Sequence, residues 1–180
     1  MKNFAIAAAA FLVFACLASP SKAESEADLK ALAPTSAGAF IQELKSSNQF
    51  EIESSLVALQ RTKNEAIKNF AQKMVHDHQD ADQKLTDTLK QANLPGPVYG
   101  MTERQRDVFN ELVATVEPQF DSRYVQDQIK GHRDALALLE SYEQHGDNDA
   151  LKQLASTLLP TIKEHLQLAE NLHSSVTARR

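Results

Sequence analysis

The sequence predicts an all-α protein: a four-helix bundle with a short extra helix in the connection between the second and third long helices. Three observations lead to this fold class. Apolar residues recur with a 3.6-residue period along four long segments, no segment shows strand-like alternation, and most of the 5 glycines and 6 prolines fall between those segments. About 157 residues remain after a predicted leader, a length that suits one domain.

Residues 1–23 are predicted to be a signal peptide and no part of the fold. The segment starts with a positive charge and continues with an apolar run over residues 5–18, which is shorter than the about 20 residues of a membrane span. Ser21 and Ala23 place small residues at the two positions that a signal peptidase reads, so cleavage is expected after Ala23. We therefore expect a periplasmic or secreted protein without a transmembrane segment. The alternative is lipid attachment at Cys16, in a stretch that resembles a bacterial lipoprotein box.

The charge and the cysteine content argue against some classes of partner and some kinds of site. The chain has 19 Lys and Arg against 24 Asp and Glu, a formal charge of −5. All 24 acids lie beyond residue 23 but two lysines do not, so the mature chain has a charge of 17 − 24 = −7. An acidic protein with both signs mixed along its helices is not expected to bind nucleic acid. Cys16 is the only cysteine, which excludes a disulfide or a thiolate metal site in the mature chain.

The first two long helices follow a flexible leader at residues 24–35. We predict one helix from Ser36, as its cap, to about Arg61. A capping box at residues 62–65, or Asn64 alone, starts the second helix, which a Leu-Pro-Gly-Pro stretch ends. The apolar positions in register are Ala37, Phe40, Ile41, Leu44, Ile52, Leu56 and Leu59 in the first helix, and Ile67, Phe70, Met74, Ala81, Leu85 and Leu89 in the second.

The second half begins with a loop and a short helix within residues 95–118, the helix starting near Thr102. A third long helix is expected to end near Gly146, and acidic residues at 147–149 cap the fourth. The bundle domain is therefore predicted over residues 36–177. The apolar positions are Phe120, Tyr124, Val125, Ile129, Leu136 and Leu139 in the third helix, and Leu151, Leu154, Leu158, Ile162, Leu166, Ala169, Leu172 and Val176 in the fourth.

Each long helix carries one ionisable side chain within its apolar stripe: Glu51, His78, His132 and His165. Glu51 lies 12 residues before Lys63 in the first turn, and His78 lies 15 residues after it. At 1.5 Å of rise per residue the two heights differ by only about 4–5 Å, and the second hairpin gives the same difference. Since a buried polar group is costly without a partner, the four side chains are expected to meet at the bundle centre.

Three imidazoles and one carboxylate suit Zn, Fe, Mn, Cu or Ni better than Ca or Mg, so these four residues are predicted as metal ligands. A closed ligand set would serve structure or storage, whereas an open position with bound water would allow redox or hydrolytic chemistry. Asp82 and Gln128 are the favoured supporting partners, while Asp77 is expected to lean toward the neighbouring helix.

The same four residues could instead form a metal-free hydrogen-bonded network that sets the helix register. The protein would then be a non-catalytic interaction or stress-related module of the cell envelope. Its outer faces, or the short helix at residues 102–115, would dock a partner protein of the envelope. No catalytic residue is identified under either hypothesis.

Several segments together carry a family resemblance: residues 40–44, 48–53, 70–75 and 77–78 in the first half, and Phe120-Asp121, Tyr124, His132, Leu159-Pro160 and His165-Leu166 in the second. They resemble the bacterial domain-of-unknown-function 4142 (DUF4142) family. The likeness covers nearly all of the mature chain. The resemblance implies an exported, ferritin-like four-helix domain without an established reaction. Compared with better-known ferritin-like proteins, the chain lacks two inward Glu-x-x-His pairs, which argues against a di-iron oxidase or iron storage.

Overall fold

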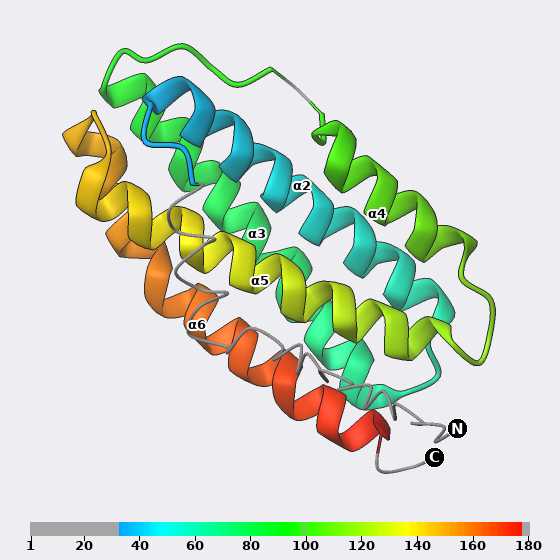
Figure 1. Ribbon diagram of the computed structural model, residues 1–180. Coiled ribbons are helices and arrows are strands. Elements are labelled where there is room, and N and C mark those ends of the chain that lie inside the picture. Colours follow the sequence, from blue (N-terminus) through cyan, green and yellow to red (C-terminus); the bar gives the residue numbers. More distant parts are fainter. Residues whose placement is uncertain (1–32, 99, 178–180) are drawn as a thin grey trace, which may run out of the picture.

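The computed structural model describes residues 33–98 and 100–177, which form a four-helix bundle with one additional short helix (Figure 1). Within these ranges there is no strand, and the predicted all-α fold class is confirmed. The long helices are α2 (Ala37–Arg61), α3 (Glu65–Gln91), α5 (Phe120–His145) and α6 (Asp149–Thr177), and the short one is α4 (Glu103–Ala114).

The predicted signal peptide at residues 1–23, Cys16 within it, and most of the leader at 24–35 lie outside the described residues. Among the helices that the structure does describe, none has both the length and the apolar character that crossing a bilayer requires.

The long helices form two hairpins that pack side by side. α2 pairs with α3 and α5 with α6, and the hairpins meet through α2 against α5 and α3 against α6. The connection from α3 to α5 runs along the whole bundle, and its α4 lies against the outside of α2 and α5 (Figure 1). α3 and α5 therefore run in the same direction. Ferritin-like bundles also have one long crossover, although a ferritin-like relationship stays a prediction here.

The helix starts lie within a few residues of the predicted positions, but two predicted caps are wrong. At α6 the predicted acidic cap is replaced by Asn148, whose Oδ1 accepts from the backbone N of Leu151 at 3.2 Å. Asn64 alone caps α3, its Oδ1 accepting from the backbone N of Ala66 at 3.0 Å. Ser36 occupies the N-cap position of α2, yet its hydroxyl makes no capping bond. Asp147 replaces it, because the backbone N of Ala37 donates to Asp147 Oδ1 at 2.8 Å. The turn between α5 and α6 thus caps the start of α2.

The interior consists of two apolar clusters with a layer of buried polar side chains between them. One cluster includes Phe40, Leu85, Leu139, Leu151 and Ile162, and the other includes Ala58, Ile67, Phe70, Met74, Phe120 and Tyr124. The polar layer contains Asn48, Glu51, His78, Gln128, His132 and His165. It is close to mid-height in each long helix, so the fold brings the predicted site residues to one level.

One predicted core position is wrong. Leu56 is 44% exposed, because Ser54, Ser55 and Ala58 take the buried positions on this part of α2.

Candidate metal centre

Three histidines meet in the polar layer, each from a different helix: His78 from α3, His132 from α5 and His165 from α6. They are 2%, 1% and 0% exposed. Their ring centroids form a nearly equilateral triangle with sides of 5.6, 5.5 and 5.3 Å. One nitrogen of each ring lies within 4.8 Å of the corresponding nitrogens of the other two. The structure therefore brings together three of the four side chains that the sequence predicts as ligands.

Glu51 lies in the same layer but does not face the three nitrogens. Its Oε1 is 3.9 Å from His132 Nδ1, the ring nitrogen that faces away from His165. Glu51 is 1% exposed, and its Oε2 has no hydrogen-bond partner in the described part of the chain. The pKa of Glu51 is raised to about 8, because burial raises it more than the hydrogen bond to Gln128 lowers it. Its role as a fourth ligand stays a prediction.

The tautomer of His78 is set by a chain of hydrogen bonds that begins at a carboxylate. Asn48 Nδ2 donates to Asp82 Oδ1 at 3.0 Å, which turns Asn48 Oδ1 toward the imidazole. His78 Nδ1 lies 3.0 Å from this oxygen and must be the donor, because an amide oxygen only accepts. His78 Nε2 is consequently left with a lone pair. It is buried, and no described residue forms a hydrogen bond with it.

The other two imidazoles are held in the same way. His132 Nδ1 donates to the backbone carbonyl of Gln128 at 2.8 Å. His165 Nε2 donates to Asp77 Oδ2, also at 2.8 Å. Because neither acceptor can donate, His132 Nε2 and His165 Nδ1 carry lone pairs. These two nitrogens face each other at 3.3 Å.

Facing lone pairs are unfavourable unless a cation lies between them, and the candidates are a proton and a metal ion. Burial lowers the pKa of His132 to about 3, more than hydrogen bonding to Gln128 raises it. Burial, with the other two histidines, also lowers the pKa of His78 well below its usual value. Neutral imidazoles are the form that binds metals. Two nitrogens bonded to a tetrahedral ion at about 2.0–2.1 Å lie about 3.3–3.4 Å apart, which matches the observed separation.

The supporting residues differ in part from those predicted. Asp82 does not contact a site histidine directly but accepts a hydrogen bond from Asn48. Gln128 supports His132 with its backbone carbonyl. Asp77 does lean toward α6, as expected, but it makes the direct contact with a site histidine. Asn48 was missed altogether. A signal was available for it, because an asparagine three residues before Glu51 falls on the same buried face of α2.

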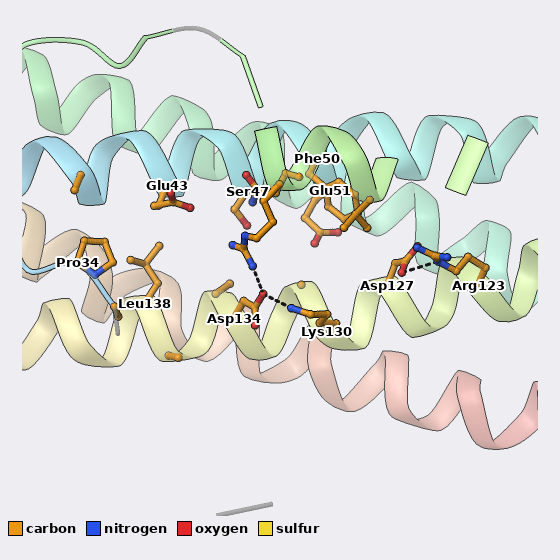
Figure 2. A pocket seen from close by; sticks show the side chains of 18 residues that line it. Pro34, Glu43, Ser47, Phe50, Glu51, Arg123, Asp127, Lys130, Asp134 and Leu138 are labelled. Atoms are coloured by element: carbon orange, nitrogen blue, oxygen red, sulfur yellow. Dashed lines mark hydrogen bonds and ion pairs between the residues drawn. The ribbon is translucent and has the colours of Figure 1, made fainter. Parts of the chain in front are cut away.

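Two cavities flank the polar layer. The larger, of about 580 Å³, lies between α2, α4 and α5 and reaches Glu51. Figure 2 shows Glu51 on the α2 side of this cavity, with the ion pairs Lys130–Asp134 and Arg123–Asp127 along α5. The smaller cavity, of about 170 Å³, is lined mainly by α3 and α6 and reaches the other side of the layer, where two of the site histidines form part of its wall.

The DUF4142 family, described as "Domain of unknown function (DUF4142)", matches residues 18–172. The chain belongs to this family. The resemblance inferred from the sequence is thereby confirmed, but the family description assigns this DUF4142 protein no reaction. No curated protein matches it.

The fold of the DUF4142 chain is similar to a solved structure described as "CopM in the Cu(II)-bound form". The TM-score is 0.64 at 16% sequence identity, and the match covers 78% of this chain and 97% of that one. At this identity the likeness shows the fold alone.

Proposed function

We propose that this DUF4142 protein binds one divalent transition-metal ion at the bundle centre, with His78, His132 and His165 as ligands. The observation that carries the proposal is the arrangement of the ring nitrogens. Each imidazole donates one N–H to a fixed acceptor, and one nitrogen of each ring lies within 4.8 Å of a nitrogen of each of the other two rings. Histidines that bind metals usually donate their second nitrogen to a carboxylate or carbonyl in this way, which sets the tautomer and orients the ring.

A metal-free network satisfies the same side chains less well. It leaves His78 Nε2 buried without a hydrogen-bond partner among the described residues. It also leaves two acceptor nitrogens, of His132 and His165, 3.3 Å apart. A buried polar atom without a partner costs about 1–3 kcal/mol, and a metal ion removes both problems at once.

The ligand set favours copper over the other metals predicted. Neutral imidazoles suit Zn, Cu, Fe and Ni, whereas Ca and Mg require mainly oxygen ligands. At a given site Cu(II) binds most tightly of the divalent first-row ions. The solved structure of CopM, a protein of similar fold, is described as Cu(II)-bound, which supports the same choice. We therefore expect Cu(II) to bind most tightly, with Zn(II) and Ni(II) as weaker competitors.

The setting we propose is the cell envelope or the exterior. The predicted signal peptide at residues 1–23 supports export, and export would expose the protein to metal ions outside the cytoplasm. A role in holding a metal ion needs no substrate and fits a family without a known reaction.

The test is metal analysis of untagged protein, so that no histidine tag contributes ligands. After equilibration with Cu(II) or Zn(II) and desalting, the protein should retain one ion per chain. His132→Ala and His165→Ala should lose that ion, whereas His145→Ala, at the exposed end of α5, should retain it. Circular dichroism checks that the variants remain helical. Folded wild-type protein without retained metal, or ligand variants that keep a full equivalent, would contradict the proposal.

A further inference from the structure

The smaller cavity leads from the surface of the bundle to the metal centre. His78 and His165 form part of its wall, together with Ala81 of α3 and Thr161 of α6. Its volume of about 170 Å³ leaves room for several water molecules, but it is below the roughly 300–1,000 Å³ typical of sites for drug-sized ligands. The space therefore suits water or a small anion and excludes a large organic substrate.

The cavity has a polar mouth that is directly linked to one ligand. Asp77 is 20% exposed in its side chain, and its Oδ2 accepts from His165 Nε2 at 2.8 Å and from Lys73 Nζ at 2.9 Å. Lys73 also pairs with Glu164 at 3.3 Å. Ammonium and carboxylate groups at the mouth can attract ions of either sign. Leu139, Leu158 and Ile162 supply apolar walls.

Among the described residues, no fourth side chain joins the three histidines on the cavity side. The group of side chains able to hold a metal in the described part of the chain contains only His78, His132 and His165. Glu51, predicted as the fourth ligand, contacts His132 on its Nδ1 side and lines the larger cavity. Closed four-ligand sites are typical of structural metals, whereas three protein ligands and a water are typical of sites where ligands exchange.

Building on the proposed function, we propose that the smaller cavity keeps one coordination position of the metal open to a small exogenous ligand. Water occupies the position at rest, and a small anion such as azide displaces it. In that exchange the bond from the metal to the water oxygen breaks and a bond to an azide nitrogen forms, without electron transfer. The centre is thereby equipped to bind a small inorganic ligand as well as to hold a metal.

The test uses protein loaded with one equivalent of Cu(II), verified by metal analysis before azide is added. Azide titration should produce a saturating azide-to-copper charge-transfer band and a changed electron paramagnetic resonance spectrum. Thr161→Phe fills the smaller cavity one turn before His165 and should weaken azide binding by at least about tenfold while copper is retained. Val108→Phe, which fills the larger cavity, should leave azide affinity unchanged. Ala81→Leu repeats the comparison from α3 if Thr161→Phe loses copper.

Two results would overturn this inference alone: copper-loaded wild type that does not respond to azide, and unchanged azide affinity in a copper-loaded variant with the smaller cavity filled. Failure to retain copper before azide is added would instead refute the proposed function, and with it this inference. The metal analysis therefore distinguishes the two failures.

Discussion

Single hydrogen bonds fix the orientation that each of the three imidazoles needs to bind a common metal ion. Asp77 is the most exposed of the groups that fix a site histidine. Partial burial raises its pKa, but hydrogen bonds from Lys73, His165 and His76 lower it below the usual range, so this carboxylate is ionised at neutral pH. An ionised acceptor makes a stronger hydrogen bond to an imidazole N–H than a neutral one does, and it makes the opposite nitrogen a better metal ligand.

Replacing Asp77 by alanine should therefore weaken metal binding by roughly 10–100-fold, because His165 loses the acceptor that orients it. Competition titration against a chelator of known affinity measures the change. Asp80→Ala is the matched control, because it removes the same charge at the next turn of α3 from a side chain that is 59% exposed. If both variants lose affinity equally, the effect is general electrostatics and not orientation of His165.

Glu51 should make the metal-free protein less stable as the pH rises. Its pKa is raised from 4.5 to about 8 in the folded protein, mainly by burial. Between these values the folded state keeps a proton that the unfolded state has released, so the free energy of unfolding falls with rising pH. Glu51→Gln removes this titration and should stabilise metal-free protein by roughly 1–3 kcal/mol at pH 7, with little gain at pH 4. Urea unfolding across this range measures the difference, and a gain independent of pH would contradict the explanation.

At the scale of the elements, α2 and α5 approach closely where Gly131 faces Glu51. A Cβ atom at position 131 would lie 2.6 Å from Glu51 Oε1, so the carboxyl group would have to move. A mid-helix glycine is normally about 1 kcal/mol less favourable than alanine. This glycine is thus explained by the side chain across the helix interface and not by the conformation of its own backbone.

Gly131→Ala should therefore lack its usual stabilising effect in wild type and regain it when Glu51 is also alanine. We expect a coupling free energy of about 1 kcal/mol or more between the two positions. A double-mutant cycle in denaturant unfolding of the metal-free protein measures it. Additive effects would show that the contact between α2 and α5 relaxes without cost.

Much of the fold could be predicted from the sequence, because helix period and breaking residues are local signals. The limits of α2 and α5 and the common height of four polar side chains follow from counting residues. The direction in which a side chain points cannot be obtained by counting residues. Glu51 has the expected height yet faces the far side of His132, since its rotamer depends on the space that Gly131 leaves. Asn48 and Asp77 become supporting residues only through the packing of α2 against α3 and of α3 against α6.

At the scale of the whole molecule, the proposed metal centre would join the two hairpins. His78 belongs to the first hairpin, and His132 and His165 belong to the second. A bound ion would link them at mid-height, where α3 approaches α6. Because the three ligands come together only in the folded bundle, metal binding should stabilise the native state over the unfolded chain.

Metal at 100 times its dissociation constant should stabilise the fold by about 2.7 kcal/mol, which corresponds to a rise in Tm on the order of 5–10 °C for a domain of this size. Calorimetry with and without Cu(II) measures the shift, and excess chelator should reverse it. His132→Ala should show no shift, whereas His145→Ala should behave as wild type.

The proposed metal ion would lie between the three imidazoles of His78, His132 and His165. Anomalous diffraction from crystals of untagged protein, loaded with one equivalent of Cu(II), tests this claim most directly. We predict one strong anomalous peak inside the bundle, about 2.0–2.1 Å from a nitrogen each of His78, His132 and His165. A copper peak only at surface histidines such as His76 or His145, with the three central rings hydrogen-bonded to one another instead, would contradict the claim.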